Sequence, residues 1–147
     1  MIPRFGRPPI AARDYVRRAG AYALLPRGKT LLVTCQSNPH PDLQLPGGGI
    51  DPGESPIAAL HREVYEETGW RISTPRRVGA FRRFVYMPEY DLWAEKICLI
   101  YMARPVLQLG PPTEPDHTAR WMDAHSAGKM LGNPGDRHFA AQYALGV

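Results

Sequence analysis

Apolar positions in the first third of the chain recur with the short spacing of β-strands. Two apolar stretches flank the turn-like residues 27–29, which predicts a hairpin. A third, shorter stretch leads into Pro46 and three successive glycines, which suit a tight bend in the backbone. The predicted strands cover residues 19–26, 30–35 and 43–45. The proline-rich residues 1–14 predict an irregular segment before them.

Strand patterns also dominate the later part of the chain, and its last part turns helical. A proline at position 75 separates two strand patterns. A third pattern follows the 87–91 loop, alternates at its start and then becomes continuously apolar. The predicted strands cover residues 71–73, 77–86, 93–105 and 120–122, with loops over 87–91 and 109–117. The predicted helices cover residues 123–131 and 136–145.

One helix is predicted in the middle of the chain, between Ser55 and Gly69. Serine is a good N-cap, the proline after it suits the first helical position, and glycine suits a left-handed C-cap. Ile57, Leu60 and Val64 recur at i, i+3 and i+7, so we expect them to form one buried stripe.

The order of these elements predicts the fold class. Many strands around one central helix, followed by a helical C-terminus, favour a mixed β-sheet that is covered on both faces. The pattern therefore predicts an α/β or α+β fold. At 147 residues we expect a single domain over 1–147.

Charge and composition narrow the function classes. The net charge is +4 and the pI is near 9.3, but the basic residues are scattered singly or in pairs. This pattern argues against stable nucleic-acid binding, and it equally suits the steering of an anionic substrate. The N-terminus lacks the apolar region of a secretory signal, and the longest apolar run, residues 97–103, is too short to span a membrane. We expect a cytoplasmic protein without a membrane segment.

Three glutamates crowd one side of the predicted central helix. Glu63, Glu66 and Glu67 lie three and four residues apart, so their side chains fall within an arc of about 100°. Like charges at these spacings destabilise an isolated helix, whereas a bound divalent cation would make them favourable. Carboxylate oxygens suit Mg²⁺ or Mn²⁺. The alternative is an ordinary solvated face.

The surroundings of these glutamates resemble a known motif. From Gly48 to Trp70 the chain carries glycine, then glutamate at 54, then Arg62-Glu63-Val64, then Glu66-Glu67, Gly69 and a bulky apolar residue. This pattern resembles the Nudix box, the signature of hydrolases that cleave a nucleoside diphosphate linked to another group. The resemblance implies an α/β/α sandwich with a mixed sheet.

The resemblance also implies a role for each matching residue. Glu66 and Glu67 would be the principal metal ligands, and Glu63 would be a further ligand or the general base. Arg62 would orient the neighbouring glutamates through salt bridges. The accessory positions would be Glu54, as a further ligand or a supporting residue, and Gly48, through its carbonyl oxygen.

The general base stays open, because in this family it can also lie on a later loop. The carboxylates of this chain outside the 48–70 segment that could serve are Glu89, Asp91, Glu95, Glu114 and Asp116. The stretch from Glu114 to Trp121 is similar to the late loop of the family, where an acidic residue often precedes a strand with a tryptophan.

Substrate recognition is less defined by the sequence. Aromatic side chains around the 87–91 loop could stack on a base, or could belong to the core. Arg82 or Arg83 could clamp phosphates, although only one of two adjacent strand residues can face the site. The aromatic candidates are Phe84, Tyr86, Tyr90 and Trp93, and the residues taken as substrate-binding candidates are Arg82, Tyr86, Tyr90 and Asp116. His40 and His117 lie in predicted loops, where a histidine is usually solvated.

The resemblance predicts a pyrophosphohydrolase that depends on Mg²⁺ or Mn²⁺ and acts on a nucleoside triphosphate or another nucleotide derivative. Dinucleotides, nucleotide sugars and RNA 5′ ends are the alternative substrates within that hypothesis, and a homodimer is a further expectation. A second hypothesis is a nucleotide sensor without turnover. A third is an isomerase on the same fold, which would need a catalytic cysteine. Cys35 and Cys98 lie in apolar strand patterns that favour free core thiols.

Overall fold

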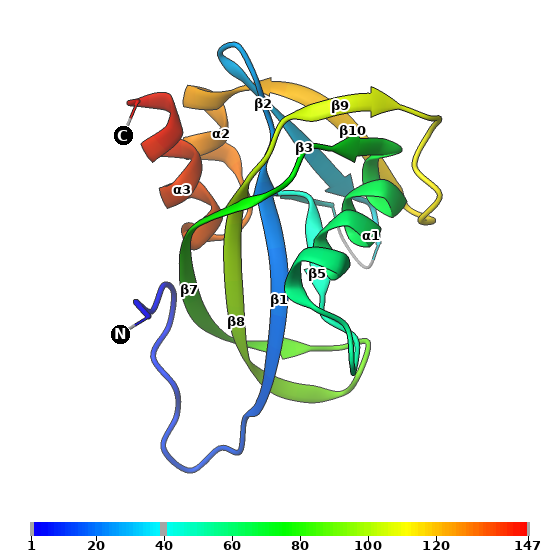
Figure 1. Cartoon of the computed structure of the whole chain (residues 1–147). Coiled ribbons are helices and arrows are strands. Elements are labelled where there is room, and N and C mark those ends of the chain that lie inside the picture. The colour runs from blue at the N-terminus through cyan, green and yellow to red at the C-terminus, as the bar shows by residue number, and fades with distance from the viewer. Residues whose placement is uncertain (1, 39–40, 147) are drawn as a thin grey trace.

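The computed structural model describes residues 2–38 and 41–146, which form ten strands and three helices within these ranges (Figure 1). His40 lies outside the described residues. The strands are β1 Val16–Leu24, β2 Pro26–Arg27, β3 Thr30–Gln36, β4 Asp42–Gln44, β5 Gly47–Gly49, β6 Trp70–Ile72, β7 Arg76–Met87, β8 Leu92–Met102, β9 Pro105–Gln108 and β10 His117–Asp123. The helices are α1 Pro56–Thr68, α2 Ala124–Met130 and α3 Pro134–Ala144.

The strands form two main sheets and one small one. The first sheet has the order β5-β1-β8-β7, in which β1 and β8 are parallel and the other neighbours are antiparallel. The second has the order β10-β3-β2, with β4 also paired to β3, and β6 pairs with β9 alone. The mixed pairing confirms the predicted sheet type.

Helices bury both faces of these strands. Adjacent residues of β3 show this most clearly, because Leu31 and Val33 pack in one core cluster with α2 and α3, while Leu32 packs in another with α1. Figure 1 shows α1 on one side of the long strands and α2 with α3 on the other. The predicted α/β/α sandwich is therefore confirmed.

The central helix begins and ends where its caps predict. The Ser55 hydroxyl accepts a hydrogen bond from the Ala58 N–H at 3.1 Å, and Pro56 is the first helical residue. Gly69 has a φ of 76° and donates its N–H to the Tyr65 carbonyl at 2.8 Å. Leu60 and Val64 are buried as predicted, but Ile57 at the first turn is 42% exposed, so the stripe is shorter than expected.

Three other predictions differ from the structure. The predicted hairpin is reduced to the two-residue β2 strand against β3, because β1 pairs along its whole length with β8 in the other sheet. β10 begins at His117, three residues earlier than predicted. β9 shares only Pro105 with the predicted 93–105 strand and continues beyond it, where it pairs with β6 although three of its four residues are exposed.

Within the described residues, no helix is both long enough and apolar enough to cross a membrane.

Candidate active site

The three-glycine strand β5 brings the backbone of the 48–70 segment against α1. Gly47 has a φ of 145°, and a Cβ there would lie 2.2 Å from the Ala21 carbonyl oxygen, so only glycine fits this position. A Cβ on Gly48 would lie 2.5 Å from the Glu63 carboxyl carbon. The Glu63 carboxylate therefore occupies the space that a larger residue at position 48 would need.

Arg62 gathers the acidic residues of the segment. Its Nε and Nη2 atoms bind the two oxygens of Glu54 at 2.8 and 2.9 Å, a bidentate pair. Its Nη1 atom reaches Glu63 at 3.0 Å and Glu66 at 3.4 Å, and its Nη2 atom also donates to the Gly49 carbonyl at 3.1 Å. The hydrogen bonds from Arg62 lower the pKa of Glu54 to about 2. One guanidinium thus forms hydrogen bonds with three carboxylates, and a fourth carboxylate, that of Asp51, lies 3.5 Å from its Nη2 atom.

Glu67 is the most buried carboxylate of the group. Its Oε1 atom accepts a hydrogen bond from the Gly47 N–H at 3.0 Å, and its Oε2 atom lies 3.8 Å from Nδ1 of His117. Burial raises the pKa of Glu67 well above its usual value, and burial likewise raises the pKa of Glu63. Burial therefore favours the protonated form of both carboxylates, in Glu63 despite its contact with Arg62, and a bound metal cation would favour their charged forms.

The carboxylate oxygens of this acidic group are chemically suited to bind a divalent metal ion. Glu63, Glu66 and Glu67 project from one side of α1, and hard oxygen donors of this kind are those that Mg²⁺ and Mn²⁺ prefer. Within residues 2–38 and 41–146, no three acidic, histidine or cysteine side chains already converge on one point as metal ligands do. Arg62 occupies the space between Glu54, Glu63 and Glu66, and its contacts define where these side chains now point.

Arg62→Lys tests this orienting contact. Lysine keeps the charge but cannot form the two-pronged pair with Glu54, so we expect kcat/KM to fall about tenfold or more. The free energy of unfolding should change by less than about 1 kcal/mol, because the pairs are partly exposed. His61→Gln, an exposed neighbour on the same helix, is the control. Wild-type turnover by Arg62→Lys would show that the guanidinium does not position these carboxylates.

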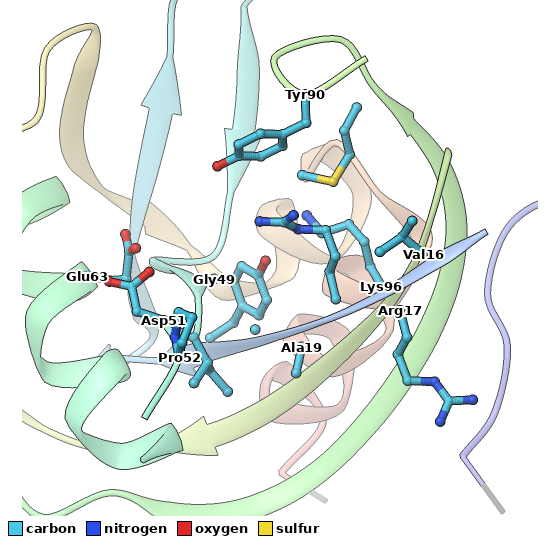
Figure 2. A pocket seen from close by; sticks show the side chains of 14 residues that line it. Val16, Arg17, Ala19, Gly49, Asp51, Pro52, Glu63, Tyr90 and Lys96 are labelled. Atoms are coloured by element: carbon cyan, nitrogen blue, oxygen red, sulfur yellow. The ribbon is translucent and has the colours of Figure 1, made fainter. Parts of the chain in front are cut away.

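Two adjoining cavities open beside the acidic group. One, of about 380 Å³, is lined by Glu63, and the other, of about 370 Å³, is lined by Glu67. Tyr22, Gly49, Met87 and Lys96 line both cavities, so the two meet along these residues. Figure 2 shows Glu63, Tyr90 and Lys96 around the first cavity.

The structure places some of the substrate-binding candidates in the cavity walls and others away from them. Tyr90 lines the first cavity, and Tyr86 lines the second while its hydroxyl bonds to Asp91. Arg82 lines neither cavity and instead pairs with Glu95 at 3.3 Å. Its neighbour Arg83 lines the second cavity, so of the two arginines the structure places Arg83 beside the acidic group.

The other aromatic candidates and Asp116 lie apart from the cavity linings. Phe84 and Trp93 both pack edge-on against Tyr15, at 4.9 and 6.3 Å between ring centroids. Asp116 is exposed, in a left-handed conformation with a φ of 66°, and its carbonyl oxygen accepts the Ser37 N–H at 2.8 Å. Its backbone thus ties the late loop to β3, while its carboxylate faces outward.

Among the later carboxylates, Glu89 lines the second cavity together with Glu67, and the backbone of Glu114 contacts α1 beside the acidic group. The N–H groups of Thr113 and Glu114 both donate to the Glu66 carbonyl at 2.8 Å, which docks the late loop on the last turn of α1. The charge of Glu114 also contributes to the raised pKa values of Glu63 and Glu67. Glu95, in contrast, is held by two arginines, Arg17 at 3.0 Å and Arg82.

Three residues beside the site were missed or misread from the sequence. His117 was expected in a solvated loop, but its side chain is only 7% exposed and packs against Glu67. Lys96 and Tyr22 line both cavities and were not singled out. The charged pair Glu95-Lys96 near the start of the otherwise mostly apolar 93–105 stretch is the signal that could have indicated Lys96.

Comparison with known protein families shows to which family the chain belongs. The sequence pattern of the NUDIX domain matches residues 14–143, which is most of the chain. The chain belongs to the Nudix family. Hydrolases of this family generally use divalent metal ions. The resemblance of residues 48–70, hereafter the Nudix box, is thereby confirmed at the level of the family.

Two relatives are similar to the chain over shorter stretches. A Bacillus subtilis protein named "Putative 8-oxo-dGTP diphosphatase" is 31% identical over 74 residues, which are 50% of this chain and 50% of the relative. An RNA pyrophosphohydrolase from Mesorhizobium japonicum is 64% identical over 28 residues, 19% of this chain and 16% of the relative. The chain thus matches half or less of the length of these relatives.

Solved structures share the fold over nearly the whole Nudix domain. A NUDIX hydrolase from Nitrosomonas europaea superposes with a TM-score of 0.71 at 19% identity, over 88% of this chain and 90% of that one. A MutT protein from Methanosarcina mazei superposes with a TM-score of 0.69 at 21% identity, over 90% and 96%. At these identities the likeness supports the fold alone.

Proposed function

We propose that this Nudix domain is a pyrophosphohydrolase that depends on a divalent metal and cleaves a phosphoanhydride bond of a nucleotide. The observation that carries the proposal is the complete Nudix box, with Arg62 holding Glu54, Glu63 and Glu66 beside two cavities. The two curated relatives support the reaction class, since both names describe pyrophosphate chemistry. Mg²⁺ is the preferred cation in the proposal, with Mn²⁺ as a substitute.

The metal would be held by Glu63, Glu66 and Glu67, with Glu54 and the Gly48 carbonyl as accessory groups. When bound, it would neutralise charge on the diphosphate and lower the pKa of water in the site. The chain's own residues prepare this site: Arg62 fixes the carboxylates, the Gly47 N–H orients Glu67, and β5 brings the Gly48 backbone against Glu63. The cavity walls hold the nucleotide beside them.

The base is proposed among three carboxylates. Glu63 and Glu67 both have raised pKa values, which suits a group that must take a proton near neutral pH. Glu114 is the candidate from the late loop, because its backbone is docked on Glu66. Glu114→Gln should separate these choices: if Glu114 is the base, kcat falls about a hundredfold or more and metal binding is retained.

A substrate panel tests the proposed reaction. The panel holds canonical and oxidised nucleoside triphosphates, ADP-ribose, NADH, diadenosine polyphosphates, nucleotide sugars and 5′-triphosphorylated RNA, each with Mg²⁺ or Mn²⁺. We expect release of phosphate or pyrophosphate from one class, and EDTA should abolish it. Tight nucleotide binding without turnover of any member would instead support the sensor hypothesis. The cytoplasmic location, the homodimer and the single-domain organisation stay predictions.

Metal affinity should depend on pH with a defined sign. Glu63 and Glu67 have raised pKa values in the metal-free protein, and a cation binds only their deprotonated forms. Affinity for Mn²⁺ should therefore rise as the pH rises through these pKa values, and binding should release protons. Calorimetry in two buffers of different ionisation enthalpy measures both effects. An affinity that stays constant between about pH 5 and 8, without proton release, would contradict the assignment.

A further inference from the structure

Three basic residues form one row across the first sheet. The register of the strands pairs Arg18 of β1 with Lys96 of β8, and Lys96 with Arg83 of β7. Residues paired in register point to the same face of a sheet, and neighbouring strands lie about 4.8 Å apart, so the row extends about 10 Å. All three side chains are partly buried. We call Arg18, Lys96 and Arg83 the cation row.

The cation row has little neutralising charge around it. Within the described part of the chain, none of its members forms an ion pair, and Nε of Arg83 is buried without a hydrogen-bond partner. Burial and the charge of Arg83 lower the pKa of Lys96. The carboxylates that act on Lys96 are the buried Asp136 and the exposed Glu89. Like charges placed opposite one another on neighbouring strands are destabilising, so an unneutralised row is unfavourable without an anion.

The opposite face of the same strands shows the contrast. There Glu95 of β8 lies in register with Arg17 of β1, and its two oxygens bind Arg17 at 3.0 Å and Arg82 at 3.3 Å. Figure 2 shows Arg17 directed away from Glu63 and Tyr90. One face of the sheet therefore pairs its arginines with a carboxylate, whereas the three cations of the other face form no ion pair among the described residues, and the buried Asp136 is the carboxylate that acts on both Lys96 and Arg83.

The cation row lies where the two cavities of the Nudix box meet. Arg18 lines the cavity that holds Glu63, Arg83 lines the cavity that holds Glu67, and Lys96 lines both. Arg18 also stacks over the Tyr90 ring, with its guanidinium carbon 4.3 Å from the ring centre. An anion bound along the row would thus lie beside the acidic group, where the proposed metal would contact the reacting phosphates.

We infer that the cation row binds the oligophosphate chain of the substrate, and that it selects nucleotides with three or more phosphates in line. A chain of successive negative charges matches a line of three cations, whereas a diphosphate joined to a neutral sugar fills only part of it. The inference rests on the proposed function, because it places the reacting bond beside the Nudix box. It assigns the specificity to residues outside that box.

Binding without turnover tests the inference independently of the reaction. The probes are orthophosphate, pyrophosphate and tripolyphosphate, measured by calorimetry with Ca²⁺ in place of Mg²⁺, and affinity should increase along this series. Lys96→Met and Arg83→Gln should each weaken tripolyphosphate binding about tenfold or more, as expected for the loss of one charged hydrogen bond. Arg82→Gln, on the opposite face, should change it by less than about twofold. If Lys96→Met or Arg83→Gln does not fold, Arg18→Gln, at the opposite end of the row from Arg83, provides a second test.

The outcomes separate the inference from the proposed function. If no nucleotide is hydrolysed but tripolyphosphate binding is lost in Lys96→Met, the proposed function fails and the anion site stands. If triphosphates are hydrolysed with an unchanged KM in Lys96→Met, Arg83→Gln and Arg18→Gln, the inference is wrong. Comparison of a nucleoside triphosphate with a short 5′-triphosphorylated RNA shows which source of oligophosphate is preferred, since both should lose affinity in these variants.

Discussion

Glu67→Gln should lower kcat by about a thousandfold or more, which corresponds to about 4 kcal/mol of lost transition-state stabilisation. The substitution removes a charged metal ligand but keeps the size and one acceptor oxygen, so the hydrogen bond from the Gly47 N–H can persist. Because Glu67 is buried and its pKa is raised, the neutral side chain should leave the melting temperature unchanged or raise it. Loss of turnover should thus come without loss of stability.

Two measurements distinguish the loss of a metal ligand from a general loss of the folded structure. The melting temperature checks the fold, and Mn²⁺ titration followed by electron paramagnetic resonance checks the ligand set. We expect weaker Mn²⁺ binding and a smaller dependence of that binding on pH, because one of the two carboxylates with a raised pKa is gone. Full activity with wild-type Mn²⁺ affinity would show that Glu67 is not a ligand.

Gly48→Ala should lower kcat about a hundredfold while the fold is kept, a loss of about 3 kcal/mol of transition-state stabilisation. The new methyl group would need the space of the Glu63 carboxylate, 2.5 Å from its carboxyl carbon. That carboxylate ends a flexible side chain, so it can turn away at little cost to stability. It would then leave both the Arg62 contact and the side of α1 where Glu66 and Glu67 project.

Gly49→Ala is the matched control for this prediction. Gly49 is the next residue of β5, and a Cβ there meets nothing within 4 Å. Neither glycine has a φ in the left-handed region, so backbone strain is the same small factor in both variants. Steady-state kinetics and thermal unfolding should separate the two variants. If both were equally active, the close packing of Gly48 on Glu63 would have no catalytic consequence.

Local sequence signals predicted the central helix and the acidic group well. Ser55, Pro56 and Gly69 define α1 through contacts within a few residues, and the spacing of its glutamates follows from helical geometry alone. The family resemblance implied that Arg62 orients the glutamates, and its contacts with Glu54, Glu63 and Glu66 all lie within eight residues of it. Features of this kind need no knowledge of the rest of the fold.

The features that the sequence pattern did not predict depend on pairing between strands that are far apart in the chain. The parallel pairing of β1 with β8 joins Arg18 to Lys96 across most of the chain, and no local rule gives its register. The same pairing replaced the predicted hairpin, since it satisfies β1 along its whole length. The choice between Arg82 and Arg83 also depended on which face of β7 meets the cavities. Residues outside the Nudix box therefore became visible only in three dimensions.

The most direct test of the account is ³¹P nuclear magnetic resonance of a nucleoside triphosphate with Mg²⁺, comparing the wild type with Glu67→Gln. We expect cleavage of one phosphoanhydride bond by the wild type, loss of the reaction with EDTA, and no cleavage by Glu67→Gln on the same timescale. Equal cleavage by both proteins, or cleavage by the wild type that persists in EDTA, would contradict a metal-dependent reaction at the Nudix box.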